Sequence, residues 1–131
     1  MTADVLTLRV YYEDTDLAGI VYYANYLKFI ERGRTEYVRA RGIDQGRLKA
    51  EQGIVFAVRR VEADYLSPAR FDDLLRIETS VVAVKGASVV MDQAVARDGV
   101  TLFVAKVTLV CLNGEGRAQR MPEAVRAALS A

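Results

Sequence analysis

Two aspartates in a short polar segment are the strongest candidates for chemistry. The segment 13–19, Glu-Asp-Thr-Asp-Leu-Ala-Gly, places Asp14 and Asp16 two residues apart, just ahead of a helical pattern. A carboxylate beside a helix start can attack or deprotonate, and the unpaired N–H groups of that start can bind an oxyanion. The arrangement suits an electrophilic carbonyl held by the main-chain N–H groups of residues 22–24, with an aspartate beside it.

The same spacing has other interpretations. Asp-x-Asp before a helix often forms only an Asx turn followed by an N-cap, and two carboxylates alone make a poor metal site. The chain has no histidine. This excludes a Ser-His-Asp triad, a Cys-His pair and a His-ligated zinc within one chain. The single cysteine, Cys111, lies in an apolar stretch and is expected to be an inert thiol. We expect neither a metal nor a cofactor.

The overall composition narrows the class of protein. The 131 residues suit one domain over 1–131, and a net charge of +1 gives no reason to expect nucleic acid as a partner. The N-terminal residues show no secretory signal, and no apolar run has the length of a membrane span. We expect a cytoplasmic protein, with peripheral contact at the inner membrane left open.

Hydrophobic periodicity predicts the elements that must position the aspartates. A first strand is expected over 6–12, and a long helix from about 24 to 41 with Tyr23 and Leu27 on its apolar side. A short helix capped by Asp44 is expected to end near Gly53. Together with the strands that follow, these elements predict an α+β domain in which a curved five-stranded antiparallel sheet wraps one long helix. Long Val-rich edge strands favour pairing with a second copy, so a homodimer is expected. The later elements are strands over 54–66, 74–84, 88–96 and 101–112, joined by short turns that include a hairpin at Asp98-Gly99, and a terminal helix over 122–129.

Residues 10–26, Val-Tyr-Tyr-Glu-Asp-Thr-Asp-Leu-Ala-Gly-Ile-Val-Tyr-Tyr-Ala-Asn-Tyr, resemble the opening signature of the hotdog-fold acyl-CoA thioesterases. The likeness is to the 4-hydroxybenzoyl-CoA thioesterase type and, within it, to the YbgC subfamily associated with the Tol–Pal system. It continues through 31–36, 56–60 and 65–73. The resemblance implies a hotdog fold and hydrolysis of an acyl-CoA to a free acid and CoA. It also implies active sites at a subunit interface, and dimers that pair into tetramers.

The resemblance also assigns roles to residues. The catalytic carboxylate would be Asp16, either as a nucleophile through a mixed anhydride or as a general base for water. The oxyanion donor would be the main-chain N–H of Tyr23. Many YbgC relatives carry histidine at this position, and a backbone donor survives that change whereas a side-chain base does not. Residues expected to bind substrate are Tyr12, Gly19, Val21, Arg59 and Arg60.

Several alternatives stay open at this stage. Arg59 and Arg60 are expected at the phosphates of CoA because guanidinium forks match phosphate geometry, although a solvated face also explains them. A hydratase or dehydratase of the same fold relies on a histidine that this chain lacks. A scaffold that binds acyl carrier protein or lipid-synthesis enzymes near the membrane, with weak hydrolysis, is the alternative of another class. A turnover assay separates it from an enzyme.

Overall fold

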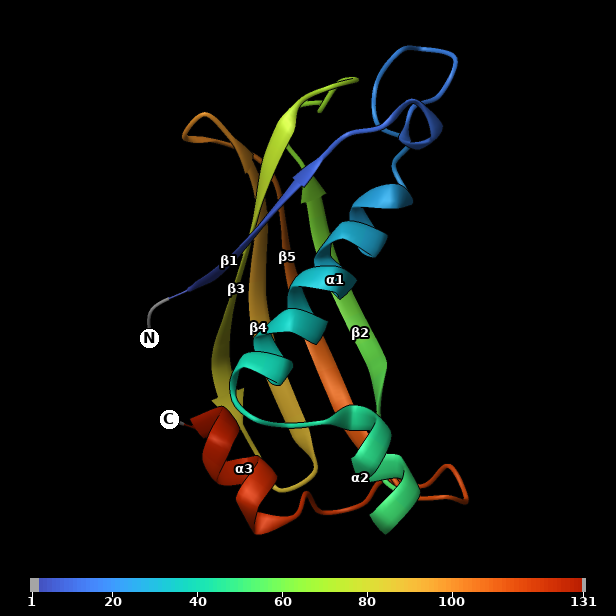
Figure 1. Cartoon of the computed structure of the whole chain (residues 1–131), viewed down its shortest axis with the longest axis vertical. Coiled ribbons are helices and arrows are strands. Elements are labelled where there is room, and N and C mark those ends of the chain that lie inside the picture. The colour runs from blue at the N-terminus through green and yellow to red at the C-terminus, as the bar shows by residue number, and fades with distance from the viewer. Residues whose placement is uncertain (1–2, 131) are drawn as a thin grey trace.

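The computed structural model describes residues 3–130. Met1, Thr2 and Ala131, at the ends of the expected single domain, lie outside the described residues. One curved sheet wraps a long helix, α1 (Asn25–Ala40), while two short helices lie at one end of the sheet (Figure 1). The predicted α+β architecture is confirmed. The other elements are β1 (Asp4–Arg9), α2 (Gln45–Gln52), β2 (Val55–Tyr65), β3 (Leu74–Val84), β4 (Ser88–Arg97), β5 (Val100–Leu112) and α3 (Glu123–Ser130).

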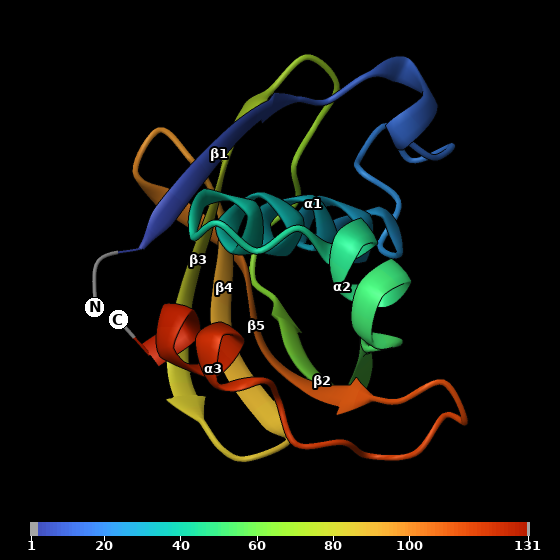
Figure 2. The same ribbon diagram turned by 60° about the horizontal axis from the view of Figure 1, so that its bottom comes forward.

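The sheet has five antiparallel strands in the order β1-β3-β4-β5-β2. The strands curve around α1, which crosses their concave face (Figure 2). The hairpin turn predicted at Asp98-Gly99 is confirmed, since both residues have positive φ, 50° and 79°. The expectation that short turns join all four later strands is wrong at one place. Strand β2 pairs with β5 and not with β3, so residues 66–73 cross the end of the sheet.

The first strand ends earlier than predicted. Strand β1 stops at Arg9, and residues 12–14 form a single 3₁₀ turn where the sequence pattern continues the strand. The turn forms because the carboxylate of Asp14 accepts a hydrogen bond from the N–H of Tyr11 at 2.8 Å. The short helix α2 begins after Asp44, which caps it as predicted, and ends at Gly53.

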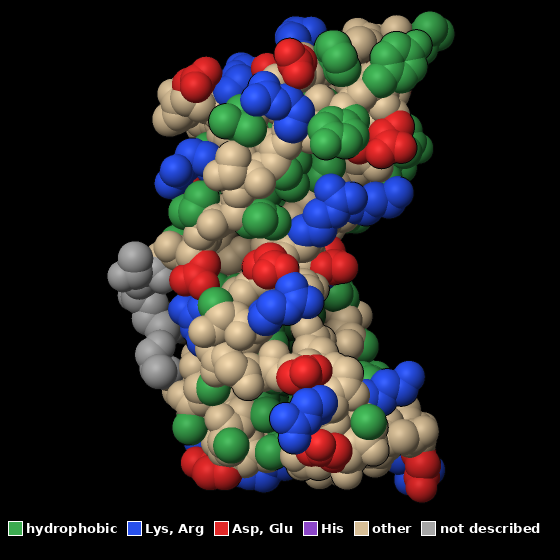
Figure 3. All heavy atoms as spheres, in the orientation of Figure 1, with side chains coloured by type: hydrophobic (Ala, Val, Ile, Leu, Met, Phe, Trp, Pro, Cys, Tyr) green, Lys and Arg blue, Asp and Glu red, His purple; other side chains and the backbone are tan. Residues whose placement is uncertain are grey.

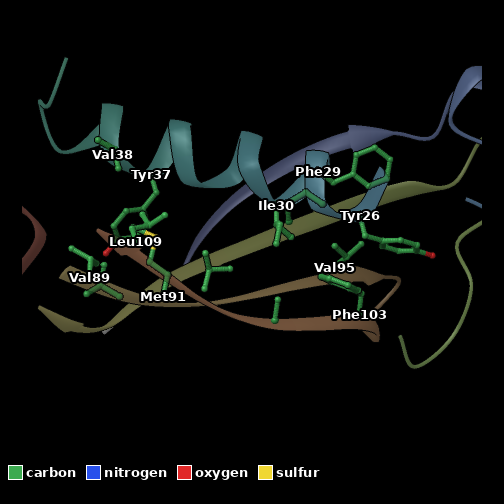
Figure 4. Packing of buried hydrophobic residues seen from close by; sticks show 14 of the residues in the cluster. Tyr26, Phe29, Ile30, Tyr37, Val38, Val89, Met91, Val95, Phe103 and Leu109 are labelled. Carbon is green, nitrogen blue, oxygen red and sulfur yellow. The ribbon is translucent and has the colours of Figure 1, made fainter. Parts of the chain in front are cut away.

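Helix α1 buries one face against the sheet. Tyr26, Phe29 and Ile30 are each at most 3% exposed, and the side chains of Tyr26 and Ile30 point toward β4 and β5 (Figure 4). Leu27, which the pattern placed on the apolar side, is 40% exposed. Tyr23 also lies off that face, because it precedes the helix and is 61% exposed.

The closest approach of α1 to the sheet is at Gly33, where a small polar cluster joins them. The buried side-chain amide of Gln93 donates to the carbonyl of Ile30 at 2.7 Å and to Thr79 Oγ1 at 2.9 Å. Arg34 donates to the same amide's oxygen at 3.0 Å. These bonds satisfy polar groups that would otherwise destabilise the interior, and they fix the axial position of the helix.

Candidate active site

The aspartate-containing segment forms a tight loop between β1 and α1. It lies at the end of the molecule opposite α2 and α3 (Figure 1). The N–H of Asp16 donates to the carbonyl of Ile20 at 2.9 Å, and the N–H of Gly19 donates back to the carbonyl of Asp16 at 3.0 Å. Gly19 has φ +80°, which a residue with a Cβ rarely adopts. The glycine therefore shapes the turn that presents Asp16.

The two aspartates have different roles in this loop. The carboxylate of Asp14 binds the N–H of Tyr11, and its carbonyl accepts from the N–H of Tyr22 and from Asn25 Nδ2, each at 2.9 Å. Asp14 is thus a structural tie between the loop and α1. Asp16 is exposed, and one of its oxygens, Oδ1, accepts from the N–H of Ala18 at 2.9 Å. Within residues 3–130 its other oxygen accepts no hydrogen bond, so it is free for chemistry.

The start of α1 offers two free main-chain donors. Of the three N–H groups expected to form an oxyanion hole, that of Tyr22 is already bound to Asp14, so this part of the expectation is wrong. Within the described residues, the N–H groups of Tyr23 and Ala24 donate no hydrogen bond. The N-cap position is Ala24, whose side chain cannot accept from the first turn. Both donors, with the positive end of the helix dipole, remain available to an anion.

A cleft of about 390 Å³ lies beside these groups and brings three of the predicted site residues together. This volume is in the range of sites for small ligands. Asp16, Val21 and Tyr23 line it, and most of the remaining wall is aromatic or aliphatic. Tyr22, expected from the sequence only as a main-chain donor, also lines it, and the lining residues that the sequence did not indicate for the site are Ile20, Tyr26, Tyr65, Leu66, Ser67 and Pro68.

An aromatic cluster forms the inner end of the cleft. The Tyr26 ring stacks on Phe103 with centroids 5.1 Å apart, and Tyr65 packs edge-on against both rings (Figure 4 shows the Tyr26–Phe103 pair). The Tyr26 hydroxyl accepts from the N–H of Ala69 at 2.9 Å. Burial raises the pKa of Tyr26 and of Tyr65 above the ordinary value of 10.0. Both side chains are therefore neutral at physiological pH.

Three predicted substrate contacts lie elsewhere in the protomer. Tyr12 is 84% exposed and packs edge-on against Phe71, at 6.5 Å between ring centroids. Arg59 and Arg60 are exposed in the middle of β2, and Arg60 pairs with Glu62 at 2.9 Å. None of the three lines the Asp16 cleft.

The surface charges, the acidic side chains and the helices add little to the choice of ligand. Positive and negative side chains are interspersed over the visible face (Figure 3). Over residues 3–130, no three Cys, Asp or Glu side chains are grouped so that they could hold a metal ion. None of the helices described is long and apolar enough to cross a membrane.

Comparisons with known proteins agree with this geometry. The family model of the thioesterase-like superfamily matches residues 10–129. The acyl-CoA thioesterase YbgC of Haemophilus influenzae is 43% identical over 122 residues, covering 92% of this chain and 90% of the relative. A probable thioesterase from Bartonella henselae has a TM-score of 0.88 at 36% identity, covering 92% of this chain and 99% of that one.

The fold itself is shared with a hotdog enzyme of known ligand. A mutant of 4-hydroxybenzoyl-CoA thioesterase, in complex with 4-hydroxybenzoyl-CoA, has a TM-score of 0.92 at 24% identity, covering 98% of this chain and 99% of that one. The expected hotdog fold is confirmed. The chain belongs to the thioesterase-like superfamily, with the YbgC acyl-CoA thioesterases among its relatives.

Proposed function

We propose that this protein is an acyl-CoA thioesterase that hydrolyses its substrate at the Asp16 cleft. The observation that carries the proposal is that Asp16 and Tyr23 line one cleft and that, within residues 3–130, an Asp16 oxygen and the Tyr23 N–H have no hydrogen-bond partner. The family assignment and the YbgC relatives support the reaction class. Asp16 and Tyr23 are the proposed catalytic groups.

The proposed chemistry needs one carboxylate and one oxyanion donor. When the thioester carbonyl is attacked, its oxygen becomes negative and accepts from the N–H of Tyr23, in the positive field at the start of α1. As a nucleophile, Asp16 forms a mixed anhydride and expels the CoA thiolate, and water then cleaves the anhydride. As a general base, Asp16 takes a proton from water as the water attacks. Either route consumes one water and releases a carboxylic acid and a thiol.

The cleft walls suit the acyl part of the substrate. Tyr22 and Tyr65 line the cleft with exposed ring surface, while Tyr26 is buried behind them. Such a wall binds an acyl or aryl group mainly by apolar contact. The CoA phosphates would lie outside it, where Arg59 and Arg60 stay the proposed contacts. Gly19 stays a proposed substrate contact because a glycine lets a ligand approach the loop backbone closely. An acyl carrier protein in place of CoA is the alternative carrier.

We also propose a homodimer built along β2, with dimers pairing into a tetramer. Strand β2 is an edge strand that pairs only with β5. Its inward-facing Val58, Val61 and Tyr65 are 48%, 39% and 48% exposed, although the Tyr65 ring packs against Tyr26 of α1. A long apolar edge of this kind is rarely left in water. A partner along β2 would also adjoin the Asp16 cleft, since Tyr65 ends that strand. Sedimentation velocity tests the assembly, and a monomer at micromolar concentration contradicts it.

The function is tested by release of free thiol from acetyl-, butyryl-, decanoyl-, palmitoyl- and benzoyl-CoA. Asp16→Asn should lower kcat/KM at least about a hundredfold, because the amide neither attacks nor takes a proton. Asp98→Asn is the matched control: it makes the same substitution in a type I′ turn, where asparagine is well tolerated. The control should keep wild-type activity.

Two results would contradict the proposal. If wild type hydrolyses none of the panel above background, the CoA-thioesterase assignment fails. Hydrolysis of acyl carrier protein thioesters, or a scaffold role, would then take its place. If wild type is active and Asp16→Asn retains that activity, the reaction class stands and the residue assignment fails.

Fractionation of cells tests the proposed cytoplasmic location against association with the inner membrane.

A further inference from the structure

One side chain from the end of an edge strand reaches the start of α1. The hydroxyl of Tyr65, at the end of β2, donates to the main-chain carbonyl of Tyr23 at 3.0 Å. The two residues are 42 positions apart in the chain. The Tyr65 ring also packs edge-on against the Tyr23 ring, with centroids 6.3 Å apart. Tyr65 therefore contacts Tyr23, the residue that carries the proposed oxyanion donor, in two ways. Its hydroxyl binds the Tyr23 carbonyl, and its ring packs against the Tyr23 ring.

The carbonyl that Tyr65 binds belongs to the peptide whose N–H is that of Ala24. The preceding peptide is held in the same way, since the carbonyl of Tyr22 accepts from the N–H of Asn25 at 2.8 Å. Both peptides thus have a bound carbonyl and, within residues 3–130, an N–H without an acceptor. A hydrogen bond accepted by a peptide carbonyl polarises that peptide and strengthens its N–H as a donor.

We propose that Tyr65 is a positioning residue for the hydrolysis assigned above: its hydroxyl fixes the Tyr23–Ala24 peptide and so holds the oxyanion-binding start of α1. The inference rests on the proposed function for its catalytic meaning. Tyr65 itself contacts neither the reacting carbonyl nor the nucleophile in this account.

The packing around Tyr65 explains why its hydroxyl can hold a peptide in place. The ring is fixed by Tyr26 at 5.4 Å and by Phe103 at 5.0 Å between centroids. Tyr26 and Phe103 are almost fully buried. The donor therefore stands on buried aromatic residues of the core and not on the loop that it positions. Without it, the segment before α1 keeps the bonds from the N–H of Tyr22 and from Asn25 to Asp14, and the bond from the N–H of Val21 to the carbonyl of Ala69.

The test compares three single variants by steady-state hydrolysis of the best substrate of the wild type. Tyr65→Phe keeps the ring and removes the donor. It should lower kcat about fivefold to tenfold and leave KM within twofold. This is the size expected when one neutral hydrogen bond that supports the oxyanion-binding peptides is lost. Tyr37→Phe is the matched control, because it removes a buried hydroxyl without a partner from the opposite half of α1. Its kcat and KM should equal those of wild type. Asp16→Asn reports on the proposed function separately.

A second readout does not depend on turnover. In ¹H–¹⁵N spectra, Tyr65→Phe should move the amide proton of Ala24 upfield and speed its exchange with solvent, because the polarising bond is lost. Tyr37→Phe should leave that resonance in place. A merely structural role for Tyr65 would instead lower the unfolding midpoint and leave kcat unchanged at a temperature where the variant is folded.

The outcomes separate the two proposals. If Asp16→Asn is inactive but Tyr65→Phe has wild-type kcat and an unmoved Ala24 amide, the function stands and the positioning role is overturned. If KM rises and kcat does not fall, Tyr65 binds substrate and the positioning role is again overturned. If wild type itself is inactive on every thioester, the proposed function fails and takes the catalytic role of Tyr65 with it.

Discussion

Replacing Gly33 with alanine is expected to destabilise the fold, although alanine is the better helix former. Gly33 lies in the middle of α1, at the point where the helix comes nearest the sheet. A Cβ at this position would lie 2.8 Å from Ile77 Cγ2 and 2.9 Å from Thr79 Oγ1. Both distances are well below the 3.5–4.0 Å or so at which carbon atoms attract.

The net change in the free energy of unfolding combines one stabilising contribution and two destabilising ones. Alanine stabilises a helix by about 1 kcal/mol relative to glycine. Inserting a methyl group into a packed interior costs about 1–3 kcal/mol. If Thr79 rotates away, the Gln93–Thr79 hydrogen bond is lost, which costs about 1 kcal/mol more. We therefore expect a net loss of about 1–3 kcal/mol, which displaces the urea midpoint downward by about 1 M.

Urea unfolding at fixed protein concentration measures this effect, because any oligomer makes the midpoint depend on concentration. Gly46→Ala is the matched control. This glycine is exposed in α2, and the nearest atom to its added Cβ, Asp44 Oδ1, is 3.4 Å away. It should gain up to about 1 kcal/mol. A Gly33→Ala protein as stable as wild type would show that the helix and sheet shift apart at little cost, and the close-packing argument would be refuted.

Three further perturbations test local features of the fold. Asp44→Ala should cost about 1 kcal/mol in urea unfolding, because it removes the N-cap of α2. Cys111 is buried, and burial raises the pKa of its thiol, so iodoacetamide at pH 8 should alkylate it at least about tenfold more slowly in native protein than in urea, as followed by intact mass. Burial also raises the pKa of Tyr26 in the folded state above its ordinary 10.0, so the stability it contributes is present below pH 10 and is lost as pH rises through the folded value. Tyr26→Phe should accordingly flatten the alkaline loss of stability in urea titrations between pH 9 and 11.

The sequence predicts local structure well because local structure follows from short-range physics. Alternating apolar residues and the Asp98-Gly99 turn fix β4 and β5 to within a residue or two. The strand order, in contrast, depends on long-range pairing and not on a local pattern. The pairing of β2 with β5 joins residues about fifty positions apart, and no local pattern encodes it. The pattern of elements predicted a curved five-stranded sheet around one long helix, and the resemblance to the hotdog enzymes identified which fold this is.

The candidate site shows the same difference between features that a local pattern predicts and features that depend on the folded structure. Spacing alone does not distinguish Asp14 from Asp16, since both are loop aspartates ahead of a helix. The structure separates them by position: each carboxylate accepts one main-chain N–H, but Asp16 lines the cleft, whereas Asp14 does not and ties the loop to α1 through its carbonyl. Likewise, the sequence does not show that the N–H of Tyr22 is unavailable to an oxyanion. That N–H donates across the loop to the carbonyl of Asp14. The Tyr65–Tyr23 contact spans 42 positions, and the only sequence signal for it was a tyrosine at the end of a predicted strand.

These contacts also explain why the side chain at position 23 can differ from the histidine that the resemblance leads one to expect. The proposed donor is a main-chain N–H, so its position depends on the peptides around it and not on the side chain it belongs to. Those peptides are held by Asp14, Asn25 and Tyr65. If this is correct, Tyr23→His should keep most of the activity, whereas Tyr65→Phe should lose more. The opposite order would mean that the side chain of residue 23 takes part in the chemistry.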